Sequence, residues 1–336
     1  MVAQAGGSHF PTVRITDVAA LAGVSAGTAS KALNNTGQLR DETRRRVREA
    51  AEQLGFAPDA RGRALSSGRS YTVGLLTTDS SGRFSIPIMQ GAEDALSAGE
   101  IALLVCDTRD DPLREQHYLR SLLARSVDGI IVTGRRTDAR EPIAVRVPVV
   151  YALNTSTDEA DTCVIVDDAG GAAAVIEHLL SLGRSRIAFV SGPQRHRTAV
   201  ERAAAAEAAC PTGLVCDPLY GEWTERWGRH AVDLLLRSHP DVDAISCASD
   251  QIARGASDRL REYGKSIPGD VAVTGFDNWE VMALACRPPL TTVDMELKEL
   301  GRTAGTMLLE AIAGTPHRGT AVLSTRLVRR ESTVGS

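Results

Sequence analysis

Residues 15–35 read ITDVAALAGVSAGTASKALNN, and this stretch decides how the first part of the chain folds. Thr16 is a favourable N-cap residue, and apolar residues follow it at helical spacing. Gly23 then supplies a turn, and Ser25 is a second N-cap before a helix from Ala26 to Leu33. The pattern predicts two short helices that meet across a tight turn.

A third amphipathic helix is predicted from Asp41 to Leu54, with small apolar residues on one face and arginines on the other. Three short helices of this kind make a helix-turn-helix module. The second helix presents Ala26 and Gly27 at its start and Lys31 about one turn later. Because its first residues are small, this helix can closely approach a groove of DNA.

Two short motifs suggest other functions, and both are rejected. Residues 23–27 match the GxSxG pattern of hydrolases, but that pattern needs a buried strand before the serine, and the preceding residues have helical periodicity. Residues 264–266 end like a phosphate-binding loop, but Arg259 stands where its first glycine belongs. Neither a catalytic serine nor a nucleotide site is therefore predicted.

The distribution of charge separates the front of the chain from the rest. Residues 1–70 carry a net charge of +4, and the remainder of the 336 residues carries −8. A basic module on an acidic body is typical of a DNA-binding protein with a separate sensing domain, because phosphate neutralisation supplies most non-specific affinity. The alternative is that the arginines at 44–48 belong to a solvated helix face.

Composition and targeting signals limit the class of protein. A length of 336 residues suggests two or three domains, and 43% hydrophobic with 24% charged residues is typical of globular proteins. No apolar run is long enough to span a membrane, and residues 1–11 lack the pattern of a secretory signal. The six cysteines form no CxxC pair, so we expect reduced thiols in the cytoplasm.

From Tyr71 onward, short apolar runs alternate with helical patterns, which predicts a parallel α/β fold. The predicted strands lie within residues 72–76, 101–106, 129–134, 147–153, 187–192, 244–249 and 271–276. Ligands of such sheets lie beyond the carboxyl ends of the strands. A later helix near 297–311 has apolar residues that either face a partner or belong to the internal core.

Three segments, TDVAALAGVS (16–25), TASKALN (28–34) and ETRRRV (42–47), resemble the LacI/GalR family of bacterial repressors. The resemblance covers residues 13–334. It implies an α/β fold class with an N-terminal three-helix helix-turn-helix domain, a hinge helix, and a two-lobed, periplasmic-binding-protein-like (type I) effector domain of parallel sheets flanked by helices.

The resemblance also implies domain boundaries. A flexible tail (1–12) precedes the helix-turn-helix domain (13–58), a hinge helix or linker (59–70) and an effector-binding and dimerisation domain (71–334). The N-lobe is expected at 71–180 and 295–318, and the C-lobe at 181–293 and 321–334.

The family resemblance assigns DNA contacts residue by residue. Ala26, Gly27 and Lys31 match base-reading positions, and Leu65 matches a leucine that wedges into the minor groove. Lys31 stands where most relatives have Arg, and Arg40 either contacts a phosphate or is merely solvated. The candidate DNA-binding residues are Thr16, Ser25, Ala26, Gly27, Thr28, Ser30, Lys31, Asn34, Arg40, Arg63 and Leu65.

The same resemblance assigns an effector site. Arg202 would donate in pairs to hydroxyls or a carboxylate, Asp277 would accept two hydrogen bonds, and Trp223 would stack on a sugar or a purine. The alternative for Arg202 and Asp277 is a structural ion pair, and Phe84 could be plain packing. The candidate effector-binding residues are Phe84, His196, Thr198, Arg202, Trp223, Ser249 and Asp277.

Nothing in the sequence requires catalysis, a metal or a cofactor. The acidic pairs Asp110-Asp111 and Asp167-Asp168 have no His or Cys at ligand spacing. We therefore predict a cytoplasmic, nucleoid-associated homodimeric repressor, not an enzyme and not a membrane protein. It binds a pseudo-palindromic operator in double-stranded DNA under control of a small-molecule effector, with a sugar as the leading candidate. The alternatives are a solute-binding sugar receptor of the transport type and a purine-responsive regulator of the same family.

Overall fold

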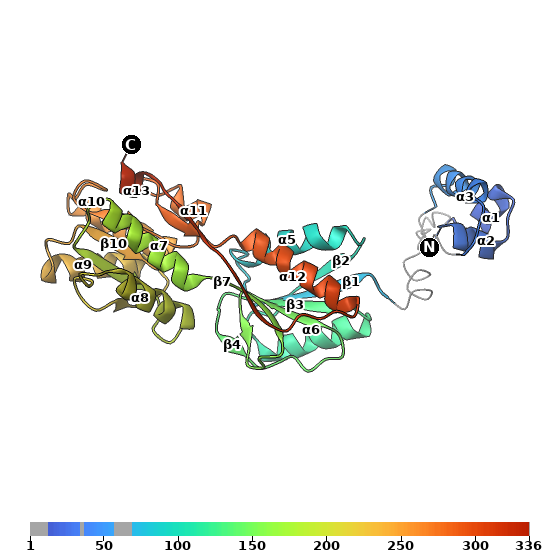
Figure 1. Cartoon of the computed structure of the whole chain (residues 1–336), viewed down its shortest axis with the longest axis horizontal. Coiled ribbons are helices and arrows are strands. Elements are labelled where there is room, and N and C mark those ends of the chain that lie inside the picture. Colours follow the sequence, from blue (N-terminus) through green and yellow to red (C-terminus); the bar gives the residue numbers. More distant parts are fainter. Residues whose placement is uncertain (1–12, 34–36, 57–68, 336) are drawn as a thin grey trace, which may run out of the picture. The chain divides into compact units, whose positions relative to one another are not determined.

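The computed structural model describes residues 13–33, 37–56 and 69–335. The chain divides into two compact units between Tyr71 and Thr72 (Figure 1). This division lies one residue after the expected start of the effector domain. The expected tail at 1–12 and most of the expected hinge, with Asn34, Arg63 and Leu65, lie outside the described residues.

In its described residues, the first unit contains three helices, α1 (Ile15–Ala22), α2 (Ala26–Leu33) and α3 (Asp41–Gln53), as the sequence predicts. Small side chains such as Ala29 and Ala32 are fully buried between them, together with Val18 and Val47. Gly23 has φ 64°, and its N–H donates to the carbonyl of Ala20 at 3.3 Å, which ends α1. The buried alanines let the three short helices pack closely.

The start of α1 differs from the prediction. The N-cap residue is Arg14 rather than Thr16, and the Asp17 carboxylate accepts a hydrogen bond from the Arg14 N–H at 2.8 Å. Thr16 is exposed inside the first turn. An acidic residue at this position satisfies a free backbone donor and suits the positive end of the helix dipole, so the helix begins earlier.

The second unit has two lobes, and the first lobe is built on a parallel six-stranded sheet in the order β13-β7-β5-β3-β1-β2. Its strands are β1 (Thr72–Thr77), β2 (Ala102–Asp107), β3 (Gly129–Thr133), β5 (Val149–Ala152), β7 (Thr162–Val166) and β13 (Gly319–Leu323). Its helices are α5 (Ser85–Ser97), α6 (Pro112–Ala124) and α12 (Leu297–Ile312). Two short strands, β4 (Ala139–Arg140) and β6 (Thr155–Ser156), pair beside it.

Helices α5 and α12 cross in direct backbone contact because glycines lie at the crossing. A Cβ atom on Gly91 would lie 1.8 Å from the carbonyl oxygen of Lys298, and one on Gly301 would lie 2.0 Å from that of Ile88. Leu300, Ala304 and Leu308 of α12 are buried in the core of the lobe. For these residues the internal-core alternative is therefore correct.

The second lobe is built on a parallel four-stranded sheet in the order β11-β10-β8-β9. Its strands are β8 (Ile187–Ser191), β9 (Leu219–Tyr220), β10 (Ala244–Cys247) and β11 (Ala272–Thr274). Its helices are α7 (Asp168–Ser181), α8 (Arg197–Ala209), α9 (Glu225–Ser238), α10 (Asp250–Glu262), α11 (Glu280–Ala283) and α13 (Glu331–Val334). An antiparallel pair, β12 (Thr292–Asp294) and β14 (Arg326–Val328), completes it.

Two parts of the expected lobe assignment are wrong. Helix α7, expected in the N-lobe, packs on α8 and contacts β10, β12 and β14 of the C-lobe (Figure 1). Strand β13 pairs with β7 along Gly319–Leu323, so residues 321–323 belong to the N-lobe sheet. The chain therefore changes lobe directly after each strand ends, at 166–168, 294–297 and 323–326.

The predicted strands agree with the fold. The predicted strand segments coincide with β1, β2, β3, β5, β8, β10 and β11. All six cysteines are free thiols, and four of them are buried. Among the described residues, no helix is long and apolar enough to cross a membrane.

Candidate functional site

The candidate DNA-binding surface lies on α2. Ala26, Gly27 and Lys31 are exposed on one face of this helix, opposite the buried Ala29 and Ala32. The exposed face thus has small residues at its start and a cationic side chain one turn later, as the sequence predicts.

Ser25 and Thr28 stabilise the start of α2. The Ser25 hydroxyl accepts a hydrogen bond from the Thr28 N–H at 3.1 Å, and the two hydroxyls lie 2.9 Å apart. Ser30 is half-buried, whereas Thr16 and Arg40 are exposed. Arg40 precedes α3 at its N-cap position and makes no side-chain capping bond.

The second unit holds a cavity of about 520 Å³ between its lobes. Loops that follow the carboxyl ends of strands from both sheets line it, as expected for parallel α/β sheets. All seven candidate effector residues lie on its wall: Phe84, His196, Thr198, Arg202, Trp223, Ser249 and Asp277. The sequence assignment therefore brings together residues that are up to 193 positions apart.

Further residues of the wall were not among the candidates. They are Thr78, Ser81, Arg83, Asp110, Arg135, Arg136, Thr137, Asp138, Leu153, Arg195, Gln251, Trp279 and Met295. Arg83 directly precedes Phe84, and Trp279 lies two residues after Asp277. The sequence indicated Arg83 and Trp279 as wall residues through their positions beside candidate residues, in loops after predicted strands. Gln251 carries the same signal, because it lies two residues after Ser249, whereas Met295 carries none.

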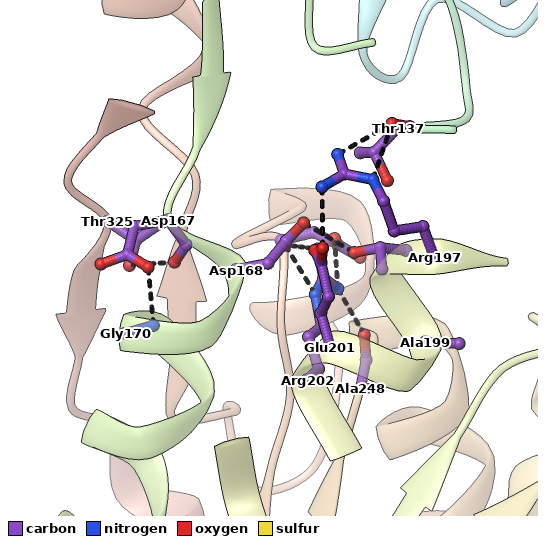
Figure 2. Close-up of polar contacts among 12 residues, drawn as sticks. Thr137, Asp167, Asp168, Gly170, Arg197, Ala199, Glu201, Arg202, Ala248 and Thr325 are labelled. Atoms are coloured by element: carbon purple, nitrogen blue, oxygen red, sulfur yellow. Dashed lines mark hydrogen bonds and ion pairs between the residues drawn. The ribbon is translucent and has the colours of Figure 1, made fainter. Parts of the chain in front are cut away.

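Arg202 is buried and fully engaged with protein groups (Figure 2). Its Nε and Nη2 donate to Asp168 Oδ1 at 2.8 and 2.6 Å, and its Nη1 donates to the carbonyl of Ala248 at 2.7 Å. The guanidinium also lies 3.5 Å from the centre of the Phe276 ring. Arg202 is therefore a member of a buried ion pair, the structural role that was left as its alternative, and it also lines the cavity.

Asp168 is the partner that sequence reasoning missed. Its other oxygen, Oδ2, accepts a hydrogen bond from the Thr198 hydroxyl at 2.8 Å, so Asp168 holds two candidate residues in place. Its neighbour Asp167 instead caps α7, because its Oδ1 accepts from the Gly170 N–H at 2.8 Å (Figure 2). The two carboxylates thus have separate roles. Within the described ranges, no cluster of three metal-binding side chains occurs.

Asp277 lies in a strained turn at the floor of the cavity. Asp277 and Asn278 have φ of 108° and 48°, a backbone region that non-glycine residues rarely adopt. Asn278 stabilises this turn, since its Nδ2 donates to Asp294 at 3.0 Å and its Oδ1 accepts from Arg330 at 2.7 Å. The turn directs the Asp277 carboxylate to Arg83, with Arg202 3.7 Å away.

A second buried carboxylate lies next to this turn. Asp250 accepts hydrogen bonds from the Thr292 hydroxyl at 2.5 Å and from the Trp279 N–H at 2.7 Å. Burial, reinforced by the neighbouring charge of Asp277, raises the pKa of Asp250 to about 8. Burial also raises the pKa of Asp277, although Arg83 and Arg202 oppose the shift. A fully buried carboxyl group beside Asp277 therefore keeps its proton near neutral pH.

The aromatic wall consists of Phe84, Trp223 and Trp279. Trp223 lies against the backbone of Gly192, where a Cβ atom would be 2.2 Å from the indole ring. Its Nε1 donates to His196 Nδ1 at 2.9 Å, and burial lowers the pKa of His196. A neutral imidazole accepts this bond, so the indole N–H is already used and the ring face is what Trp223 offers.

Ser249 also has a structural role, because its hydroxyl accepts a hydrogen bond from the Ile252 N–H at 3.3 Å and caps α10. Arg197 links the two lobes at the other side of the cavity. Its Nε and Nη2 donate to the carbonyl of Thr137 at 3.2 and 2.8 Å (Figure 2). Its backbone N–H donates to Asp138 at 2.9 Å. The hydrogen bonds of Arg197 thus connect the two lobes across the cleft.

Two known domain patterns match this chain. Residues 14–59 match the family described as bacterial regulatory proteins, lacI family, and residues 176–333 match the periplasmic binding protein-like domain. These two matches correspond to the helix-turn-helix unit and to the greater part of the two-lobed unit.

Relatives match along nearly the whole chain. The HTH-type transcriptional repressor PurR of Aliivibrio fischeri is 32% identical over 317 residues, with 90% of this chain and 93% of the relative covered. The HTH-type transcriptional regulator CelR of Thermobifida fusca is 32% identical, with 96% and 98% covered. These proteins are transcriptional regulators and not enzymes.

Solved structures of regulators also match nearly the whole chain. A lac repressor dimer bound to operator and an anti-inducer matches with a TM-score of 0.80 and 26% identity over 96% of this chain and 99% of that one. A CelR–cellobiose complex matches with a TM-score of 0.68 and 30% identity over 95% and 99%. The three-helix unit, and the cavity between the two parallel sheets of the second unit, agree with these matches. The chain belongs to the LacI family of DNA-binding transcriptional regulators.

Proposed function

We propose that this protein is a homodimeric repressor that binds a pseudo-palindromic operator and changes its affinity for DNA when a neutral sugar binds between the lobes. In this proposal residues 13–58 bind DNA, 59–70 form the hinge, and 71–334 bind the effector and dimerise. The protein acts in the cytoplasm on the chromosome.

The observation that carries the effector class is the pairing of charges in the cavity. Arg202 is paired with Asp168 and Arg83 with Asp277. These two buried ion pairs therefore have no net charge that an ionic effector would neutralise. Aromatic faces beside paired polar groups suit the apolar face and the hydroxyls of a carbohydrate.

The comparisons support a sugar through the complex of CelR with cellobiose, which matches over nearly the whole of both chains. The ribose operon repressor of Halalkalibacterium halodurans is 30% identical over 323 residues. A purine is the second candidate, because a repressor named PurR is among the relatives and the aromatic wall suits a nucleobase equally well.

DNA recognition is proposed to rest on α2. Lys31 would donate to a guanine edge, and Ala26 and Gly27 would allow the backbone to approach the major groove. Ser25, Thr28 and Ser30 would lie toward the phosphates beside them, with Thr16 and Arg40 flanking the helix.

The experiment selects genomic DNA fragments with the purified protein at about 0.15 M salt, which is near physiological ionic strength. A shared pseudo-palindrome supports the proposal. The recovered operator is then titrated in the presence of glucose, ribose, cellobiose, hypoxanthine or guanine. A shift in DNA affinity with one of the sugars supports a carbohydrate effector, whereas a shift only with the purines overturns the sugar assignment and leaves the regulator intact.

A further inference from the structure

Arg83 and Asp277 form an ion pair that joins the two lobes across the cavity. Arg83 lies in the loop between β1 and α5 of the N-lobe, and Asp277 lies in the strained turn after β11 of the C-lobe. Their side chains are only 12% and 6% exposed. A buried contact between charges from opposite lobes depends on how far the lobes are separated.

Aromatic rings from both lobes hold the Arg83 side chain. The guanidinium carbon lies 4.9 Å from the ring centre of Phe84, its neighbour in the N-lobe, and 4.6 Å from that of Trp279 in the C-lobe. Cation–π contacts of this kind strengthen when water is excluded. Arg83 therefore meets two groups of the opposite lobe, a carboxylate and an aromatic face.

Opening of the cleft would break both contacts at once. Asp277 would keep Arg202 at 3.7 Å, and Arg83 would lose the Trp279 face. Water would enter and hydrate both charges, so the net free energy of the ion pair is smaller than its direct attraction. A contact of this kind favours the closed arrangement but can still be released.

We propose that Arg83 is a latch that holds the two lobes together when no effector is bound. Asp277 is also a proposed effector contact, so an effector that bonds to this carboxylate would share it with Arg83 or displace it. The latch itself does not depend on the identity of the effector, and it can be tested without one.

A second contact across the cleft limits how much one substitution can do. The guanidinium of Arg197 in α8 donates to the Thr137 carbonyl on the opposite lobe, and its backbone N–H donates to Asp138. Loss of Arg83 alone should therefore loosen the floor of the cleft without separating the lobes completely, and a combined Arg83→Gln and Arg197→Gln variant should loosen it further.

The test is hydrogen–deuterium exchange of the effector-free, full-length protein at constant pH. The reporter is the turn at residues 276–279, because it lies on the lobe opposite the substitution and its Trp279 N–H donates to the buried Asp250. In Arg83→Gln we expect its amides to exchange about tenfold faster than in the wild type. Amides of β3 report on global stability and should be unchanged.

Arg135→Gln is the matched control. Arg135 is another arginine of the cavity wall, and within the described part of the chain no ion pair links it to a carboxylate. The control should exchange like the wild type. Arg83→Lys keeps the charge and should give an intermediate rate, which provides a second measurement if Arg83→Gln folds poorly. Wild-type exchange at 276–279 in both Arg83 variants would overturn the latch.

Discussion

At the scale of single residues, the most consequential finding is that Arg202 lines the cavity and is also one half of a buried ion pair. Its side chain and that of Asp168 are each only 4% exposed. Removal of one partner from such a pair leaves an uncompensated buried charge, which is far more costly than the pair is stabilising. Substitutions at this position therefore affect folding as well as any response to effector.

Arg202→Ala should abolish the effector response and also lower the free energy of unfolding by about 3–5 kcal/mol. Urea denaturation and operator titration measure the two effects separately. The double variant Asp168→Asn with Arg202→Ala removes the orphaned charge and should recover part of the lost stability without recovering the response. If Arg202→Ala is as stable as the wild type, the ion pair is not structural.

The raised pKa of Asp250 predicts a dependence of stability on pH. The folded protein holds the proton up to about pH 8, whereas an unfolded Asp releases it near its ordinary pKa. The folded state binds more protons in this window, so this group contributes stability that declines as pH rises from about 4 to 8. In Asp250→Asn, the unfolding free energy relative to the wild type should rise across that window, since Asn can satisfy Thr292 and Trp279 without titrating. A constant difference across the window would argue against a protonated Asp250.

At the scale of elements, one face of α2 contributes to folding and the other is available for recognition of DNA. Its buried alanines pack on α1 and α3, whereas Lys31 is exposed. Lys31→Ala should therefore leave thermal unfolding unchanged and weaken binding to the selected operator by about 1–3 kcal/mol. Arg318→Ala, an exposed arginine of the second unit, is the control and should bind DNA normally. If Lys31→Ala binds the operator and a scrambled sequence each with the wild-type affinity, Lys31 does not belong to the recognition surface.

The crossing of α5 and α12 is the tightest helix contact of the N-lobe. Gly91→Ala would place a methyl group against the carbonyl of Lys298, so the helices must separate, and overpacking of this kind costs about 1–3 kcal/mol. Gly99→Ala is the matched control, because a Cβ atom there would lie no closer than 3.4 Å to its neighbours. Chemical denaturation should show a loss for Gly91→Ala and little change for Gly99→Ala. Similar values for the two variants would mean that the crossing readily adjusts.

At the scale of the whole molecule, the helix-turn-helix unit and the two-lobed unit each have a core of their own. A fragment of residues 72–336 should therefore fold cooperatively, keep the effector affinity of the full chain and lose operator binding. Circular dichroism and calorimetric titration with the sugar found to shift DNA affinity would check this. An unfolded fragment would show that the first unit is needed to stabilise the second.

The sequence by itself determined the three-helix unit and the alternation of strands and helices, because helix caps and apolar periodicity are local signals. The family resemblance pointed further to all seven side chains on the cavity wall. Only the tertiary structure decided which charges meet: Asp168 became the partner of Arg202, and Arg83 reached Asp277 across 194 positions. It also placed α7 in the C-lobe. These outcomes depend on packing and burial between distant segments, which no local pattern of residues encodes.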